Sequence, residues 1–261
     1  MKFKKLIEDS AERKNSNIIL ALDLPFHEPA KRQELMAQAS RIVDKVGKHV
    51  CAVKINHHLT LPLGVFDGVQ ELIRCVHEEE LPVIMDCKVN DVGATNRVIA
   101  QYYYSAGFDA LIANPFVGWD EGLQPVFELA SALGKGVILL VFMSHKGAHE
   151  GYGQTVYDAE TGEKTVQYKV FAKKALEWKA DGAVVGAKWL DKIQETRCIL
   201  KENVPIYSPG IGAQGGNAAD AVKAGAHYLI VGREIIQSTD PSITAKKLSA
   251  ISRAPHKKQE K

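Results

Sequence analysis

The stretch Leu81-Pro-Val-Ile-Met-Asp-Cys-Lys-Val-Asn-Asp91 joins an apolar, strand-like run to a dense group of charges. Alternate side chains of an extended segment share a face, so we predict that Asp86 and Lys88 point the same way. Asp91 follows just past the strand end. Such charges are costly beside a buried strand unless they pair with one another or act on a ligand. An ion pair that only fixes a loop would explain this stretch alone, but charged residues at other strand ends favour a site.

Seven further apolar runs resemble this one and are continuous rather than alternating, which is typical of strands buried on both faces. The eight predicted strands are 17–23, 51–56, 82–88, 110–115, 136–143, 182–186, 205–210 and 228–233. Helical patterns lie between them, for example at 30–46 and 68–79. This alternation predicts an α/β fold, a (β/α)8 TIM barrel forming a single domain over residues 1–253. An open doubly wound sheet is the alternative.

The connection between the fifth and sixth predicted strands is longer than the others. Its pattern predicts a short hairpin inserted at about residues 146–170, on the face where barrels build active sites. A lid and a surface ornament both fit this position. Asp240 and Pro241 predict the start of the last helix. We expect residues 254–261 to form a disordered basic tail, and the lysines near both termini to be solvated.

The bulk composition excludes several functional classes. The chain has 261 residues, 46% of them hydrophobic and 25% charged, and its net charge of +2 is too balanced to indicate nucleic acid. The four cysteines lack CxxC pairing and metal-ligand spacing, so we expect reduced thiols in a cytoplasmic protein. The first residues lack the apolar core of a signal peptide, and no apolar run approaches the roughly 18 residues of a membrane span. We therefore expect no metal, no other cofactor and no membrane partner.

The seventh predicted strand runs into the glycine-rich segment Ser208-Pro-Gly-Ile-Gly-Ala-Gln-Gly-Gly216, which opens a predicted helix at 218–224. Glycine lets backbone amides approach an anion, and a helix N-terminus favours negative charge. The eighth strand then presents Arg233, whose fork of donors suits phosphate. Phosphate sites after strands seven and eight recur in barrels, so a phosphorylated small molecule is the predicted ligand.

Five charged residues are predicted to converge on the other half of the same mouth: Asp23, Lys54, Asp86, Lys88 and Asp91. None of them fits a nucleophile–base–orienter triad, and the lysines would compete with a divalent cation. The set suits electrostatic stabilisation and proton transfer instead. The acids that flank Lys88 are expected to keep it charged, which makes it a candidate general acid.

Taken together, these segments resemble the orotidine 5'-phosphate decarboxylase family, and its archaeal branch most, over about residues 17–245. The shared motifs are Asp86-x-Lys88-x-x-Asp91 with Thr95, Ala-Leu-Asp23, Val-Lys54-Ile, Met143-Ser144-His145, the segment Ser208 to Gly216, and Val231-Gly-Arg233. The Asp-x-Lys-x-x-Asp signature alone is shared with relatives such as 3-hexulose-6-phosphate synthase. The motifs on the fifth and seventh strands favour the decarboxylase.

The resemblance implies cofactor-independent conversion of orotidine 5'-monophosphate to UMP and CO2, the last step of UMP synthesis. It implies that Lys88 protonates C6 of the pyrimidine and that Asp86 lies beside the departing carboxylate. Lys54 would orient Asp86 and, with Asp23, hold the ribose hydroxyls. It also implies a homodimer in which Asp91 and Thr95 come from the neighbouring subunit. Ser144 would bind the pyrimidine, and the implied phosphate contacts and closing loop comprise Pro209, Gly210, Ile211, Gly212, Gln214, Gly215, Gly216, Gly232 and Arg233.

Three alternatives remain open from the residues. A metal-dependent aldol-type enzyme or epimerase on the same barrel would act on a pentulose or hexulose phosphate and would be sensitive to chelators. A non-catalytic barrel that binds nucleotides would be expected to lose some of the charged strand-end residues. Association with orotate phosphoribosyltransferase is the third alternative, although the chain contains no second domain to support a fusion.

Overall fold

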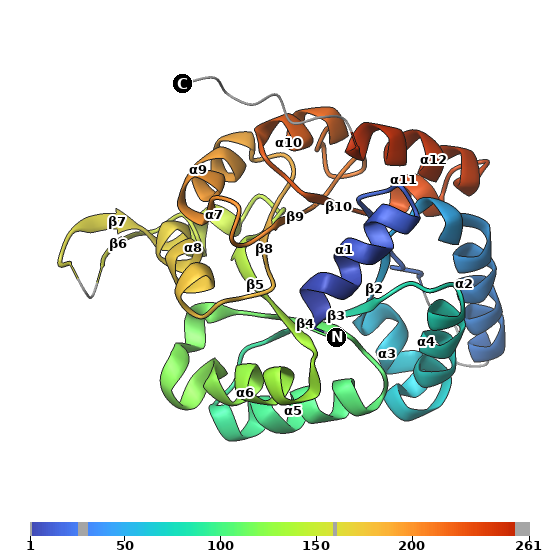
Figure 1. Cartoon of the computed structure of the whole chain (residues 1–261), viewed down its shortest axis with the longest axis horizontal. Coiled ribbons are helices and arrows are strands. Elements are labelled where there is room, and N and C mark those ends of the chain that lie inside the picture. Colours follow the sequence, from blue (N-terminus) through green and yellow to red (C-terminus); the bar gives the residue numbers. More distant parts are fainter. Residues whose placement is uncertain (1, 26–30, 159–160, 254–261) are drawn as a thin grey trace.

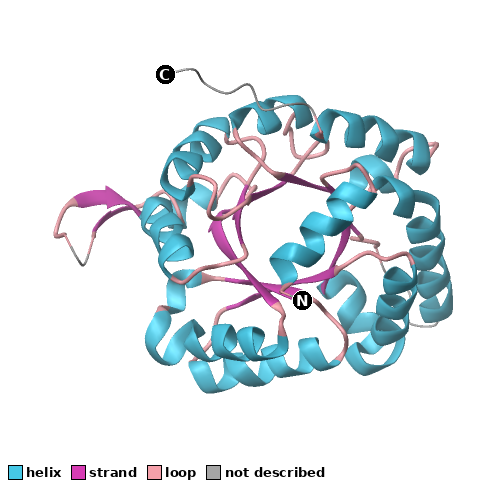
Figure 2. Ribbon diagram, in the orientation of Figure 1, coloured by secondary structure: helices cyan, strands magenta, loops and turns pink. Residues whose placement is uncertain are grey.

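A computed structural model describes residues 2–25, 31–158 and 161–253. Eight parallel strands close into a barrel, as predicted, in the order β1-β10-β9-β8-β5-β4-β3-β2. Figure 2 shows the strands enclosed by a ring of helices. The barrel strands are β1 (Ile18–Ala21), β2 (Ala52–Asn56), β3 (Val83–Val89), β4 (Ala110–Ala113), β5 (Gly136–Phe142), β8 (Gly182–Val185), β9 (Ile206–Pro209) and β10 (Tyr228–Val231).

The helices cover the outside of the barrel (Figure 1). They are α1 (Phe3–Arg13), α2 (Arg32–Val46), α3 (His57–Leu63), α4 (Val69–Glu78), α5 (Gly93–Ser105), α6 (Gln124–Leu133), α7 (Ala148–Gly151), α8 (Gln167–Glu177), α9 (Leu190–Leu200), α10 (Ala218–Ala224), α11 (Arg233–Ile236) and α12 (Pro241–Ser252), with shorter helical turns η2 (Gly47–His49), η3 (Gly64–Gly68), η4 (Pro115–Val117) and η5 (Trp119–Leu123). The strands are almost wholly buried because barrel side chains fill the inside and helices cover the outside.

Helix α1 lies across the end of the barrel where the strands begin (Figure 1). Phe3 and Ile7 are fully buried, and a Cβ placed on Gly136 would lie 2.4 Å from the Phe3 ring. Lys4 Nζ donates a hydrogen bond to the Asn203 carbonyl at 3.1 Å. The lysine-rich start of the chain is therefore an ordered helix that closes the barrel, which differs from the solvated end expected from its charges. The i, i+4 spacing of Phe3 and Ile7 carries the signal for this helix.

The insertion after β5 contains the predicted hairpin, formed by β6 (Thr155–Tyr157) and β7 (Lys164–Val166) in antiparallel pairing. Residues 159 and 160 of its turn lie outside the described residues. Figure 1 shows this arm projecting sideways from the barrel. None of its described residues lines the cavity described below, so a lid role remains a prediction.

The last helix begins as predicted, since Asp240 Oδ1 accepts a hydrogen bond from the Ile243 amide at 3.0 Å and Pro241 occupies the first turn. Helix α2 was expected from residue 30, which lies outside the described residues, as does the whole predicted tail at 254–261. Because the eight barrel strands are parallel, as predicted, their carboxyl ends all lie on one face, where the polar residues gather.

Candidate active site

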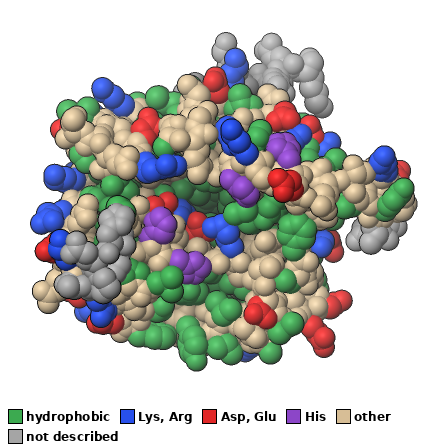
Figure 3. Space-filling view, turned by 180° about the vertical axis from the view of Figure 1, so that it is seen from behind, with side chains coloured by type: hydrophobic (Ala, Val, Ile, Leu, Met, Phe, Trp, Pro, Cys, Tyr) green, Lys and Arg blue, Asp and Glu red, His purple; other side chains and the backbone are tan. Residues whose placement is uncertain are grey.

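The carboxyl ends of the strands surround a cavity of about 450 Å³. Figure 3 looks onto this face, which is hollowed near its centre, with charged side chains in the hollow and histidines around it. The cavity is lined by Ala21, Asp23, Lys54, Asn56, His58, Asp86, Lys88, Ile112, Leu140, Met143, Ser144, Val184, Pro209, Gly210, Ile211, Ala213, Gln214, Ile230, Gly232 and Arg233. An apolar floor with polar groups on its walls is typical of a small-molecule site.

Strand register brings the acidic and basic residues together on one wall. Lys54 on β2 pairs with Ala21 on β1 and with Ile84 on β3. Two residues further along each neighbouring strand come Asp23 and Asp86, so both carboxylates lie on the same side as the Lys54 ammonium.

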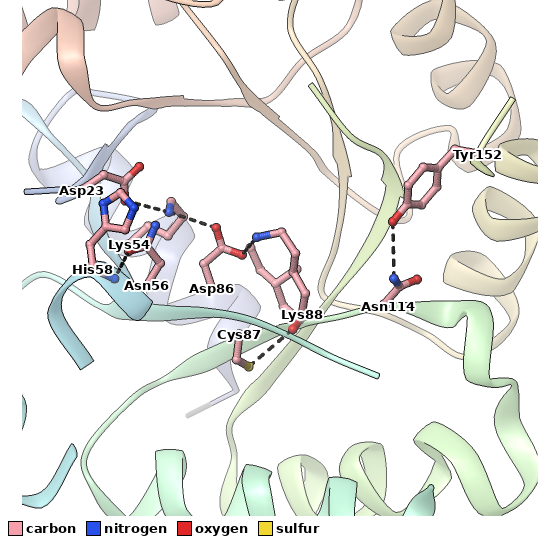
Figure 4. Close-up of polar contacts among 10 residues, drawn as sticks. Asp23, Lys54, Asn56, His58, Asp86, Cys87, Lys88, Asn114 and Tyr152 are labelled. Atoms are coloured by element: carbon pink, nitrogen blue, oxygen red, sulfur yellow. Dashed lines mark hydrogen bonds and ion pairs between the residues drawn. The ribbon is translucent and has the colours of Figure 1, made fainter. Parts of the chain in front are cut away.

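The resulting ion pairs run from Asp23 through Lys54 and Asp86 to Lys88, as Figure 4 shows, and are called the Asp–Lys chain below. Lys54 Nζ donates to Asp23 Oδ1 at 3.2 Å and to Asp86 Oδ2 at 3.0 Å. Lys88 Nζ donates to Asp86 Oδ1 at 2.6 Å. The predicted pairing of Asp86 with Lys88 is therefore present, and Lys54 extends it to a third strand.

Burial and pairing act in opposite directions on these groups. Burial lowers the pKa of Lys54, but the negative charges of Asp86 and Asp23 outweigh it, and the pKa is raised overall. Burial raises the pKa of Asp86, but the ammonium groups of Lys54 and Lys88 outweigh it, and the pKa is lowered. Both groups therefore stay charged at neutral pH, and Lys54 is only 4% exposed.

Lys88 occupies an unusual backbone conformation. Its φ is +50°, in the left-handed region that a lysine rarely adopts, and the pairing of β3 with β4 shifts register between Met85 and Val89. Within this irregular stretch, the neighbouring side chains of Cys87 and Lys88 make different contacts. Cys87 Sγ contacts the Ile112 carbonyl at 3.6 Å, whereas Lys88 lines the cavity. Local strain of this kind persists where the surrounding structure fixes it and is concentrated at functional sites.

The glycine-rich loop after β9 is held by its own backbone. The amides of Gly212, Gly215 and Gly216 donate to carbonyls within the loop, at 2.7 to 3.0 Å. These three glycines do not line the cavity, whereas Pro209, Gly210, Ile211 and Gln214 do. Gly212 has a φ of +67°, and a Cβ there would lie 2.2 Å from a Glu234 carboxylate oxygen, so the turn requires glycine. In this conformation the three glycines shape the loop.

Gln214 and Arg233 supply the remaining side-chain donors of this wall. Both line the cavity, and Gly232 lies between β10 and α11 beside Asp23. No hydrogen bond or ion pair of the Arg233 guanidinium occurs within the described ranges, so this group is available to a ligand. Six residues of the set predicted for the phosphate and its loop therefore share the cavity with Asp23, Lys54, Asp86 and Lys88: Pro209, Gly210, Ile211, Gln214, Gly232 and Arg233. Gly212, Gly215 and Gly216 of that set do not line it.

Two polar residues of the cavity, Asn56 and His58, were missed by sequence reasoning. The side-chain oxygen of Asn56 caps helix α3 by accepting from the His58 amide at 2.9 Å. Asn56 and His58 both line the cavity, as Asp23 does, and all three are labelled in Figure 4. The sequence signal for Asn56 is its position two residues after Lys54, on the same face of the strand. The sequence holds no such signal for His58, because His58 lies on helix α3, which was not predicted.

Asp91 and Thr95 do not reach the cavity of their own chain. Both are exposed at the start of α5, and Asp91 Oδ1 accepts from the Val92 amide at 2.7 Å. Asn96 fixes this turn by accepting from the Asp91 amide at 2.9 Å and donating to the carbonyls of Asp91 and Gly122. The backbone of Asp91 is thus held by Asn96, and its side chain does not line the cavity.

Among the described residues, no group of three His, Cys, Asp or Glu side chains could hold a metal ion. Nor does any helix in the part of the chain that the structure describes have the length and apolar character needed to cross a membrane.

The fold and the cavity define a (β/α)8 barrel whose mouth combines the ion pairs of Asp23, Lys54, Asp86 and Lys88 with the side-chain donors of Gln214 and Arg233. Residues 16–248 match the Orotidine 5'-phosphate decarboxylase / HUMPS family. The chain belongs to this family.

Individual relatives agree with this assignment. The chain is 37% identical over 232 residues to the orotidine 5'-phosphate decarboxylase of Methanosarcina mazei, covering 89% of this chain and 93% of that protein. The crystal structure of orotidine 5'-phosphate decarboxylase from Pyrococcus horikoshii OT3 has a TM-score of 0.72 and 34% identity, covering 91% of this chain and all of that one. Leishmania donovani UMP synthase has a TM-score of 0.84 and 26% identity. That match covers 97% of this chain, which spans 57% of the UMP synthase chain.

Proposed function

We propose that this protein decarboxylates orotidine 5'-monophosphate to UMP and CO2 without a cofactor. The observation that carries the proposal is the ion-pair chain from Asp23 through Lys54 and Asp86 to Lys88. It lies in the same cavity as the unpaired Arg233 and an apolar floor. A phosphorylated nucleotide with a planar, partly apolar base matches a cavity that combines these ion pairs, Arg233 and an apolar floor.

Loss of CO2 from C6 of the pyrimidine leaves a carbanion in the ring plane, which the ring π-system cannot delocalise. Stabilisation must then come from a cation fixed where the negative charge develops. Lys88 is such a cation, because its ammonium is held at 2.6 Å from Asp86. The same ammonium delivers the proton to C6 as the carbanion forms.

Lys54 and Asp86 hold Lys88 in place. Lys54 is buried and bridges two carboxylates, so Asp86 cannot turn away from Lys88 without breaking both ion pairs. Asp86 also lies where the substrate carboxylate would be accommodated. Repulsion between these two carboxylates in the bound substrate would be relieved as CO2 departs.

The phosphate wall lies away from the bond that breaks. Gln214, Arg233 and the amide of Gly232 bind the phosphate in this proposal, Ser144 binds the pyrimidine, and the segment from Pro209 to Gly216 closes over the ligand. Binding energy at such a remote group can be used to order the reacting end, so substrates without the phosphate are expected to lose kcat as well as affinity.

The direct test is incubation of the purified protein with orotidine 5'-monophosphate in excess EDTA, following substrate absorbance and CO2 release. Rapid conversion is expected. Absence of conversion, with turnover of a phosphorylated ketose once Mg²⁺ is restored, would assign the protein to the synthase side of its family. Lys88→Ala should abolish turnover while UMP still binds, and substantial residual activity would contradict the general-acid role.

We further propose that the active unit is a homodimer in which Asp91 and Thr95 complete the partner's cavity. Thr95, Val98 and Tyr102 share one face of α5, and Val98 and Tyr102 are 49% and 55% exposed. Phe66 packs on Tyr102 with ring centroids 5.8 Å apart and is itself 55% exposed. An exposed apolar stripe beside Asp91 supports burial against a second copy.

Mixing two inactive variants tests the shared site. Lys88→Ala and Asp91→Ala subunits should each be inactive alone. A mixed dimer would contain one intact site, built from Lys88 of one subunit and Asp91 of the other. Random mixing of equal amounts should therefore restore about a quarter of the wild-type activity by simple subunit statistics. No recovery, with mixed dimers demonstrated by mass spectrometry, would refute the sharing.

The four free cysteines support a reducing, cytoplasmic setting for this dimer.

A further inference from the structure

Trp189 lies just after β8, outside the cavity, and reaches back to the loop that follows β5. Its indole Nε1 donates to the Met143 carbonyl at 3.0 Å. Met143 and Ser144 both line the cavity, whereas Trp189 does not. The indole therefore holds the backbone of Met143, the residue before Ser144, from the side that faces away from the cavity.

A second contact fixes the same loop from the same strand end. The Gly186 amide donates to the Phe142 carbonyl at 2.9 Å, and a Cβ on Gly186 would lie 2.6 Å from the Ser144 Cα. Such an approach is possible only for glycine. The segment after β8 thus contacts the last residue of β5, Phe142, and the two residues that follow it, Met143 and Ser144.

The Trp189 ring is itself held in an aromatic cluster, defined here as Phe142, His149, Tyr152, Tyr168 and Trp189. Its centroid lies 4.6 Å from that of His149 and 6.0 Å from that of Phe142. Phe142 also contacts Tyr152 at 6.1 Å and Tyr168 at 5.5 Å. Edge-to-face pairs of this kind restrict ring orientation as well as burying apolar area.

The aromatic cluster includes the base of the insertion. His149 and Tyr152 lie at its beginning and Tyr168 at its end, and the Tyr168 amide donates to the Tyr152 carbonyl at 2.9 Å. The part of the insertion that packs on Trp189 is thus its base, while the arm formed by β6 and β7 projects outward (Figure 1).

We propose that Trp189 is a positioning residue that sets the height and orientation of Ser144 at the pyrimidine end of the cavity. The aromatic cluster at the base of the insertion holds Trp189 in that position. This inference rests on the proposed function, because it assigns Trp189 an effect on the reaction through the base-binding role of Ser144.

The test compares Trp189→Phe with Trp178→Phe. Trp178 is a matched control: it is also half-buried, its ring lies 5.2 Å from the Lys174 ammonium as that of Trp189 lies 4.5 Å from the Lys188 ammonium, and it packs on Trp119 and Phe127 away from the cavity. Phe keeps the aromatic ring in both variants but removes the indole donor.

The first readout is amide hydrogen exchange of the ligand-free protein, which does not depend on turnover. Exchange across residues 143–148 should be faster in Trp189→Phe than in the wild type and in Trp178→Phe. Unchanged exchange in Trp189→Phe would overturn the inference. Faster exchange in a protein that does not decarboxylate orotidine 5'-monophosphate would retain the positioning role and reject the proposed function.

The second readout is a kinetic cycle with Ser144→Ala. Trp189→Phe should raise KM roughly 5- to 10-fold, the range expected for one neutral hydrogen bond, with kcat changed much less. In the Ser144→Ala background the same substitution should add nothing, since Trp189 acts through Ser144. An independent, multiplying effect in the double variant would overturn the inference, as would an equal loss in Trp178→Phe.

Discussion

Replacing Lys54 with Met removes the central cation of the Asp–Lys chain, and its cost follows from the geometry. Breaking a buried ion pair by removing one partner costs about 3–5 kcal/mol, because the other charge is left buried. The lower end applies to this pair, since Asp86 keeps Lys88 at 2.6 Å and the Asp23 side chain is 31% exposed and can be hydrated. We therefore expect Lys54→Met to lower the free energy of unfolding by about 3 kcal/mol.

This loss translates into a measurable shift in melting temperature. The entropy of unfolding is about 2.1 cal/mol/K per residue, so the 261-residue chain unfolds with about 0.55 kcal/mol/K. A loss of about 3 kcal/mol then lowers Tm by about 5 °C. Differential scanning calorimetry at neutral pH is the assay, with Lys5→Met as a control because Lys5 pairs with Asp9 at the surface. The control should melt with the wild type.

The pH dependence gives the sharper test. The pKa of Asp86 is lowered in the folded protein, because Lys54 and Lys88 outweigh the effect of burial. A carboxyl with a lowered folded pKa stabilises the fold above its unfolded pKa, and this contribution is lost as pH falls through the folded pKa. In Lys54→Met the pKa of Asp86 should rise, so protonation relieves the buried charge. The Tm difference should be largest at neutral pH and shrink below about pH 4. A difference under 2 °C, or one that is independent of pH, would refute the reasoning.

The remaining predictions concern the rim of the cavity. Arg233→Ala should raise KM about 10- to 100-fold, the range of a lost charge-assisted hydrogen bond, and leave kcat at saturation nearly intact; steady-state kinetics with an unchanged KM would remove the phosphate assignment. His58→Ala should raise KM severalfold because His58 lines the cavity, while His57→Ala, one residue away and outside the lining, should not; equal effects would show that only α3 is disturbed. Replacing residues 157–164 with Gly-Ser should leave kcat/KM within about twofold, because the arm projects away from the mouth; a large loss would support a lid.

The strands and the charged strand ends could be predicted because both depend on local pattern. A barrel strand buried on both faces must be continuously apolar, and a charge at its end is conspicuous against that background, as at Asp86 and Lys88. The short loop hairpin was equally visible, since two β-branched segments flank a turn at Gly162.

The features that sequence could not give depend on contacts between distant segments. Nothing in the local sequence distinguishes Trp189 from an ordinary loop residue, because its role depends on the packing of the segment after β8 on the loop after β5. The residue types around Lys88 do not indicate its left-handed backbone, and the turn at Asp91 depends on hydrogen bonds from its backbone to Asn96, five residues away. Helix α1 was missed because its lysines were weighed and the spacing of Phe3 and Ile7 was not.

The closure of the barrel by α1 has a consequence for the order of events during translation. Helix α1 leaves the ribosome before the strands of the barrel, yet its binding site includes Gly136 and the Asn203 carbonyl, which follows Lys4 by 199 residues. At about 5–20 residues per second, the apolar side chains Phe3 and Ile7 wait roughly 10–40 s before their site exists. A nascent chain thus carries this helix without its binding site for most of its synthesis. A chaperone that binds short apolar helices would find its target at this end of the chain.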